Sequence, residues 1–434
     1  MAFLGMRGNG DWVTDQRPKN WREMILRLYP NGDVPLTAIL SKMKSERTDD
    51  PEFNWWTKGL ASQRAAVTGV YTDAALSSLY TSGAVAGDTL YIKMALASCK
   101  EFRPGHQVLL RDASDYTVDV NAKVTARNLN GSSSYIAVKL LEDDDNSTSN
   151  DLSNCDTCLI IGNINAEGST MPSAIAYDPT KYSNYTQIFR TPLSITRTAR
   201  RTRLRTGDQY REAKREALEL HGIEMEKAWL FGIPTEGTGD NGKPERTTGG
   251  ILYWLRTYAS DNVNDFTLNS SYAGKAWLDE GGGEDWIKNY LELVFRYGKN
   301  EKLALCGSGA LLGINNLAQA SSHFTMTATT KSYGIQVTEW VTPFGVIYLK
   351  IHPLFSYEAT LRNSMLLLEP QNLVYRYIDD TTFYGEGEAK QAAPGTNGGR
   401  VDGTEEEYLT EAGLEFHHPS TMMFLNGVGQ NNSL

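Results

Sequence analysis

The side chains most able to do chemistry gather in one arginine-rich segment, TRTARRTRLRT, at residues 196–206. A guanidinium group can donate two parallel hydrogen bonds to a carboxylate or a phosphate, so this segment can hold an acidic protein surface or nucleic acid. If the segment is a strand, Arg200 lies on one face and the other arginines lie on the opposite face. The candidate contact residues are Arg197, Arg200, Arg201, Arg203 and Arg205.

The charge of the chain is divided unevenly between this segment and the rest. Residues 197–215 carry eight basic and two acidic side chains, a net +6, whereas the whole chain of 434 residues carries −10. Acidic side chains concentrate at 142–145, 279–285 and 402–415. This complementarity favours a contact between the arginine-rich segment and an acidic face of another copy. Nucleic acid as the partner, and a solvated face without a partner, are the two alternatives.

A glycine-rich loop has the spacing of a phosphate-binding loop. Gly237 to Lys243 reads GTGDNGK, which matches Gly-x4-Gly-Lys. The motif needs Ser or Thr in the next position to ligate Mg²⁺, and it needs a helix after the loop. Pro244 stands there instead. We therefore interpret the loop as a surface turn and keep a nucleotide-binding enzyme as the less favoured alternative.

No other group of residues predicts catalysis, a cofactor or a metal. Gly307, Gly309 and Gly313 depart from the dinucleotide-binding fingerprint because the third glycine comes one residue late. Cys155 and Cys158 form a single pair, where a structural zinc site usually needs four ligands. The six histidines are dispersed along the chain. We expect a protein that is not an enzyme, with no catalytic, cofactor-binding or metal-binding residues.

The composition is that of a folded protein with two or three domains. The chain is 22% charged and 40% hydrophobic, which argues against intrinsic disorder. No apolar run approaches the ~20 residues that cross a bilayer, so we expect no membrane partner. The N-terminus lacks the apolar core of a signal peptide. Four cysteines in a chain of this length indicate a reducing compartment.

A long helix is predicted directly after the arginine-rich segment. From 208 to 231 there is no proline, and apolar residues recur at steps of three or four, which is the pattern of an amphipathic helix. Thr206 and Gln209 have the spacing of a capping box at its start. The Gly-Ile-Pro sequence at 232–234 ends it.

A β-rich module and an arm are predicted before that segment. Residues 86–168 contain short alternating or β-branched runs and the hairpin signal Asn130-Gly131, which favour a small barrel or sandwich. Residues 1–60 are rich in tryptophan and broken by proline and glycine, so we expect an arm that lies against a surface. Trp55 and Trp56 are further candidates for contact with another copy.

The order of these parts resembles a tailed-phage major capsid protein of the Hong Kong 97 type. The most specific stretch is NYTQIFRTPLSITRT at 184–198, followed by TGDQ, the long helix, and EMEKAWLFG at 224–232. The stretches at 333–348 and 365–373 resemble the C-terminal strands of that family.

The resemblance implies an α+β fold, the Hong Kong 97-type capsid fold with a β-rich insertion. Its implied parts are an N-terminal arm (1–60), an extended E-loop (61–206) that includes a β-barrel-like insertion (86–168), a P-domain spine helix with the following loop (207–249), an A-domain (250–345), and the C-terminal strands of the P-domain and A-domain (346–434).

The resemblance also implies a structural role in the virion capsid. Copies of the chain would self-assemble as hexamers and pentamers, in the host cytoplasm, into the icosahedral head that encloses the double-stranded DNA genome. The implied partners are other copies, a separate scaffolding protein, a portal, a decoration protein, and packaged DNA held on the inner face without sequence specificity. A phage tail or accessory virion β protein is the alternative, and it would explain the β-rich module but not the long helix.

Overall fold

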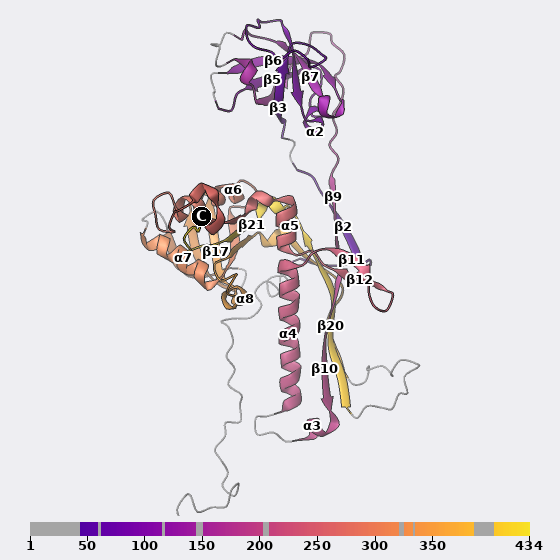
Figure 1. Ribbon diagram of the computed structural model, residues 1–434. Coiled ribbons are helices and arrows are strands. Elements are labelled where there is room, and N and C mark those ends of the chain that lie inside the picture. Colours follow the sequence, from indigo (N-terminus) through magenta and orange to yellow (C-terminus); the bar gives the residue numbers. More distant parts are fainter. Residues whose placement is uncertain are drawn as a thin grey trace, which may run out of the picture. The chain divides into compact units, whose positions relative to one another are not determined.

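The computed structural model describes residues 44–59, 62–114, 118–144, 151–202, 208–320, 325–332, 335–385 and 403–434 (Figure 1). The chain divides into a barrel unit, Lys58–Thr180, and a main unit, Met1–Thr57 together with Lys181–Leu434. Arg203 and Arg205, and most of the predicted arm, lie outside the described residues.

The barrel unit is a closed barrel with the strand order β3-β4-β7-β6-β5-β8. Its strands alternate in hydrophobicity, so that side chains such as Ile92, Val108, Val124 and Val138 fill the interior and are fully buried. The elements are β3 (Arg64–Tyr71), β4 (Thr89–Met94), α2 (Leu96–Cys99), β5 (His106–Arg111), β6 (Asp119–Asn128), β7 (Tyr135–Leu140) and β8 (Thr157–Asn163).

The barrel begins earlier than the residue 86 predicted for the β-rich module. Strand β3 pairs with both β4 and β8 and thereby closes the barrel. The connection from β3 to β4 is long and carries no hairpin signal. For this reason the predicted module did not include β3. Strands β6 and β7 do form a hairpin around Asn130-Gly131. Its turn is a 3-10 turn, Gly131–Ser133, and not the type I′ turn that is typical of an Asn-Gly hairpin, because Asn130 has a φ of −138°.

The main unit contains a four-stranded sheet in the order β1-β19-β20-β10, and helix α4 lies against β10 and β20 (Figure 1). On β10, every second residue, Phe189, Thr191, Leu193 and Ile195, is buried, and the residues that alternate with them are exposed. This alternation turns one face of the sheet toward α4. The strands are β1 (Ser45–Arg47), β10 (Gln187–Thr196), β19 (Leu373–Tyr384) and β20 (Gly403–Phe416).

Helix α4 (Gln209–Phe231) agrees with the long helix predicted from 208 to 231. Its 23 residues give a length of about 35 Å. The N-cap is Asp208, whose carboxylate accepts a hydrogen bond from the Tyr210 N–H at 3.0 Å. Asp208 therefore does the capping that we predicted for Thr206, which lies outside the described residues.

A seven-stranded sheet with helices packed on it forms the rest of the main unit, in the order β13-β21-β18-β14-β17-β16-β15. Apolar side chains from α6 and α7, such as Trp286 and Ile314, share one core cluster with Leu349 and Leu367 of the sheet. The elements are β13 (Val263–Asp265), α6 (Gly283–Phe295), β14 (Glu301–Cys306), α7 (Ser308–Ala320), β15 (Thr325–Ser332), β16 (Ile335–Thr342), β17 (Gly345–Ile351), β18 (Met365–Leu368) and β21 (Met423–Asn426).

Shorter elements connect these two sheets. Helix α5 packs against α4, β2 pairs with β9, and β11 pairs with β12 as a hairpin. Their bounds, with those of two short helices, are β2 (Glu52–Thr57), β9 (Thr180–Tyr185), α3 (Arg197–Arg201), β11 (Thr235–Thr238), β12 (Pro244–Thr247), α5 (Ile251–Tyr258) and α8 (Pro353–Tyr357). Over the described ranges, no helix combines the length and apolarity needed to cross a membrane.

Candidate functional site

The arginine-rich segment is helical where we predicted a strand. Helix α3 (Arg197–Arg201), which we call the arginine helix, follows directly after β10. The Thr196 hydroxyl caps it by accepting a hydrogen bond from the Ala199 N–H at 3.2 Å. Arginine and alanine favour a helix once a cap is present, and the strand prediction ignored that preference. Helical spacing puts its three arginines on one face, and all are exposed: Arg197, Arg200 and Arg201.

An acidic face lies on the side of the four-stranded sheet that turns away from α4. Along β20, Glu406, Tyr408 and Thr410 are buried, so the residues between them point the other way. Sequence reasoning noted an acidic run at 402–415 but missed this face, although the alternate spacing of its glutamates was the signal for it. The acidic face consists of Asp379, Glu405, Glu407 and Glu411, which are exposed or half-buried.

The charges of the acidic face are largely unbalanced by the residues that the structure describes. Arg190 donates two hydrogen bonds to Glu407, at 2.8 and 2.7 Å. Asp379 and Glu411 are directly opposite each other in the β19–β20 ladder, and like charges in such a pair are unfavourable. Among the residues described, no basic side chain forms an ion pair with Asp379, Glu405 or Glu411. The face is therefore suited to a cationic partner.

A hollow adjoins the acidic face at Glu411. It has a volume of about 430 Å³ and lies between the start of β10 and the β11–β12 hairpin. Ile188, opposite Glu411 in the ladder, lines it and is 56% exposed. The hollow thus offers an apolar contact beside the carboxylates.

The two tryptophans predicted as contact residues have different environments. Trp55 is only 5% exposed and packs beside Phe53, Tyr182 and Trp254 in the core of the main unit. Its prediction as a contact with another copy is therefore corrected, since strand β2 turns alternate residues inward. Trp56 points the other way and is 63% exposed, so it remains available for contact.

Buried polar contacts fix the strands that carry the acidic face to helix α4. His221 of α4 hydrogen-bonds Thr191 of β10 at 2.9 Å and Thr410 of β20 at 2.7 Å. Burial lowers the pKa of His221, so its ring is neutral at pH 7. Glu226, also on α4, hydrogen-bonds His352 at 2.8 Å in a site where both side chains are fully buried.

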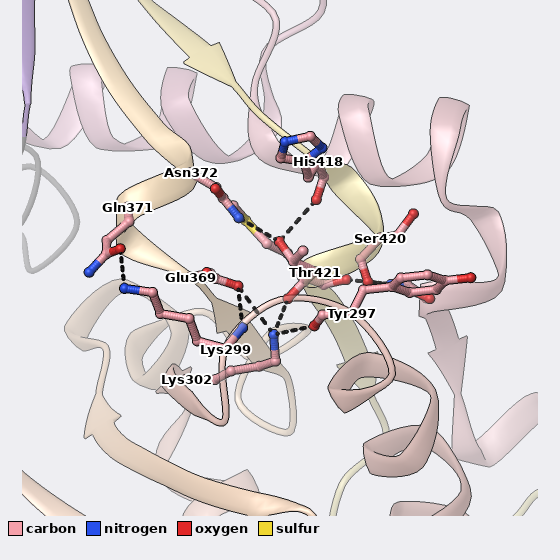
Figure 2. Close-up of polar contacts among 11 residues, drawn as sticks. Tyr297, Lys299, Lys302, Glu369, Gln371, Asn372, His418, Ser420 and Thr421 are labelled. Carbon is pink, nitrogen blue, oxygen red and sulfur yellow. Dashed lines mark hydrogen bonds and ion pairs between the residues drawn. The ribbon is translucent and has the colours of Figure 1, made fainter. Parts of the chain in front are cut away.

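A buried lysine ties together three segments beside the seven-stranded sheet (Figure 2). The Lys302 ammonium donates to the carbonyl oxygens of Thr421 and Tyr297, at 2.8 and 3.3 Å, and lies 3.5 Å from a carboxylate oxygen of Glu369. Lys302 is inaccessible to solvent. Burial lowers its pKa and the charge of Glu369 acts in the opposite sense. Because both Lys302 and Glu369 are buried, we interpret the cluster as structural.

The motifs considered for other chemistry have structural explanations. Residues 237–243 lie in the β11–β12 hairpin, where the N–H groups of Gly239 and Gly242 are bonded within the loop. A phosphate cradle needs those groups free and a helix after them. A Cβ on Gly313 would lie 2.4 Å from the Cα of Gly429, so close packing accounts for that glycine. Within the described ranges, no cluster of three or more metal-ligating side chains occurs.

The cysteines of the chain are buried thiols. The four are unpaired, and burial raises the pKa of each of them, that of Cys155 to about 12. A thiol of this kind is a poor nucleophile and a poor metal ligand.

The comparisons with known proteins decide the family. A family model described as SU10 major capsid protein matches residues 7–429. The chain belongs to this family of phage major capsid proteins. The major capsid protein of Pseudomonas phage PaMx41 is 25% identical over 420 residues, which cover 94% of this chain and 92% of that protein.

Two solved structures of similar extent come from Mycobacterium phage Bobi and Microbacterium phage Oxtober96. The first is 8% identical with a TM-score of 0.43, covering 95% of this chain and 96% of that one. The second is 9% identical with a TM-score of 0.40, covering 94% and 95%.

Family membership confirms the main functional prediction from the sequence. The protein is a tailed-phage major capsid protein, a structural component of the virion whose copies assemble with one another into the shell. Its fold is mixed α/β. The alternative of a tail or accessory protein is thereby replaced.

Proposed function

We propose that the protein builds its shell with a Hong Kong 97-type arrangement of parts. Helix α4 and the four-stranded sheet form the P-domain, and the seven-stranded sheet with α6 and α7 forms most of the A-domain. The barrel unit is an insertion in the E-loop. The order of these elements along the chain supports the proposal, because the barrel unit interrupts the main unit just before the strand that leads toward the long helix.

In this proposal the protein acts without catalysis. Hexamers and pentamers close an icosahedral head around the double-stranded DNA, starting in the host cytoplasm with a scaffolding protein, a portal and a decoration protein as partners. The net charge of −10 suits an inner wall along which DNA must slide, since a cationic wall would bind phosphates by counterion release.

The arginine helix is the contact that holds neighbouring copies in register, and it binds the acidic face of the next copy. This assignment rests on the distance between Glu411 and the arginine helix of the same chain. Glu411 is opposite Ile188, whereas the arginine helix begins after Thr196, eight residues further along β10. At about 3.3 Å per residue the separation is roughly 26 Å, several times the length of an arginine side chain.

One chain therefore cannot neutralise the Asp379–Glu411 end of its acidic face with its own arginine helix, but a second copy can. Each exposed ion pair would contribute only about 0.2–1 kcal/mol. The contact gains its effect from repetition, since every copy in a closed shell both donates an arginine helix and accepts one.

The test is a charge swap in the full-length protein. Arg197→Glu with Arg201→Glu removes the cationic partner, and Asp379→Lys with Glu411→Lys removes the anionic one. We expect each double variant to form fewer than a tenth of the wild-type number of shells by electron microscopy. The fourfold variant, which restores complementarity and the wild-type net charge, should recover shells of normal size.

A matched control separates local from global charge effects. Lys100→Glu with Lys181→Glu changes two exposed cations elsewhere and reaches the same net charge as the arginine double variant. It should assemble normally. Normal shells from the arginine double variant would refute the contact. If both double variants form few shells and the fourfold variant does not recover them, the arginine helix is still a contact. The acidic face is then rejected as its partner.

A further inference from the structure

Two aspartates in the barrel unit are buried with a carboxylate oxygen that has no partner. Asp144 is 4% exposed and Asp151 is 1% exposed. Oδ1 of Asp144 and Oδ2 of Asp151 are inaccessible to solvent and make no hydrogen bond. A buried ionised carboxylate is stable only when it is paired with a cation, bound to a metal or fully hydrogen-bonded.

The two carboxylates lie at the same point of the fold. Asp151 is the N-cap of a 3-10 turn, Leu152–Asn154, and its other oxygen accepts from the Ser153 N–H at 3.1 Å. The Leu152 N–H, next in the chain, donates to Oδ2 of Asp144 at 3.1 Å. The start of this turn therefore brings both side chains together.

Tyr80 contacts the oxygen of Asp144 that also accepts from Leu152. Its hydroxyl donates to Oδ2 of Asp144 at 2.6 Å and accepts from the Ala84 N–H at 3.0 Å. The Tyr80 hydroxyl therefore occupies one oxygen of Asp144 and leaves Oδ1 for another partner.

Within the described ranges, no basic side chain compensates these two carboxylates. Across the described part of the chain, neither aspartate forms an ion pair with lysine, arginine or histidine. The hydrogen bonds that they accept come from neutral groups. Two negative charges with two free oxygens match one divalent cation in charge and in ligand type.

We propose that Asp144 and Asp151 bind one hard divalent cation of the Ca²⁺ type, through Oδ1 of Asp144 and Oδ2 of Asp151. Carboxylate and carbonyl oxygens are the ligands of such cations, and Ca²⁺ accepts irregular sets of them at 2.3–2.6 Å. The cation joins Asp144, which follows β7, to the 3-10 turn before β8. It thereby stabilises the closed barrel. The site is independent of the arginine helix and of the acidic face.

Terbium luminescence on the full-length, unassembled protein tests the site directly. Tb³⁺ replaces Ca²⁺ at oxygen sites and emits when a nearby aromatic ring is excited. None of the nine tryptophans lies between residues 58 and 180, so tyrosine is the ring within this unit that can sensitise a bound Tb³⁺. We expect saturable emission with one Tb³⁺ per chain, displaced by Ca²⁺, and reduced at least fivefold by Tyr80→Phe.

Calcium titration calorimetry and thermal unfolding give the matched comparison. After EDTA treatment, Ca²⁺ should raise the melting temperature of the wild type by about 5 °C or more, because a ligand that binds only the folded state stabilises it. Asp144→Asn with Asp151→Asn should lose Ca²⁺ binding. In EDTA this variant should melt no lower than the wild type, because it has no uncompensated charge. Glu167→Gln with Asp178→Asn, at exposed positions, should bind Ca²⁺ like the wild type.

Absence of Ca²⁺ and Tb³⁺ binding by the wild type would overturn the proposal. Unchanged binding by the asparagine variant would overturn it too, by placing the cation elsewhere. If that variant does not fold, Asp144→Asn and Asp151→Asn are measured singly. Each should weaken Ca²⁺ binding at least tenfold, and a smaller loss in both would count against the site.

Discussion

Replacing Lys302 with methionine should destabilise the main unit strongly without changing its surface. The substitution keeps the length of the side chain but removes the ammonium that donates to Thr421 and Tyr297 and faces Glu369 (Figure 2). Glu369 has only 7% of its side chain exposed. Breaking one partner of a buried ion pair costs about 3–5 kcal/mol because the other charge stays buried.

A second substitution separates the cost of the unpaired charge from the loss of packing. Lys302→Met combined with Glu369→Gln removes both charges while keeping a side chain that can accept from the Lys299 N–H, a bond of 3.3 Å in the wild type. We expect the combined variant to recover more than half of the lost free energy of unfolding. The residual cost reflects the carbonyl oxygens of Thr421 and Tyr297, which lose their donor.

Hydrogen exchange by mass spectrometry is the suitable assay, because a protein with two units need not unfold in one step. A loss of 3–5 kcal/mol should speed exchange in peptides from β14 and β18 by roughly a hundredfold to several thousandfold. Peptides from the barrel unit serve as the internal reference. If Lys302→Met changes exchange in β14 less than about threefold, the ion pair does not hold this region together and the reasoning is wrong.

Three further predictions concern other buried groups. Gly313→Ala should cost about 1–3 kcal/mol in urea unfolding, because its Cβ would lie 2.4 Å from the Cα of Gly429; an unchanged midpoint would contradict the packing. Burial acts to raise the pKa of Glu415, but hydrogen bonds from His417 and Arg376 lower it overall. Glu415 therefore stabilises the fold above about pH 4.5 and loses this contribution as the pH falls, so Glu415→Gln should be less stable at pH 7 and show a flatter acid transition by calorimetry. Burial lowers the pKa of His221, so wild-type stability should fall as the pH drops below about 6.5, and His221→Gln should show a smaller slope between pH 6.5 and 5 in the same measurement.

The features that local sequence determines were predictable. Helix α4 differs by one residue from the predicted start because a 23-residue amphipathic pattern without proline leaves little choice. The arginine helix was missed because, over so short a run, both a strand and a helix would place several arginines on one face. The cap at Thr196 favours the helix. Trp55 and Trp56 are identical in type and adjacent, so only the pairing of β2 shows which one is buried.

Features that depend on distant residues were not predictable from one sequence. The spacing of the glutamates in β20 indicates only part of the acidic face, because its completion by Asp379 opposite Glu411 requires the register of β19 against β20. Likewise, Lys302 directly precedes a short apolar run in the sequence. Its burial follows from the pairing of β14 with β17 and β18, and long-range pairing of this kind leaves no local signal.

The positions of the charges suggest why stability and assembly can be altered separately. The charges that hold the fold together, such as those of Lys302 and Glu415, are buried and paired within the chain, so changing one leaves its partner uncompensated. Those assigned to assembly, such as Arg201 and Glu411, are exposed or half-buried on the surface, where a single pair contributes at most about 1 kcal/mol. Reversing them should leave the free chain folded, with hydrogen exchange like that of the wild type. A loss of shells in such a variant therefore reports on the contact between copies and not on misfolding.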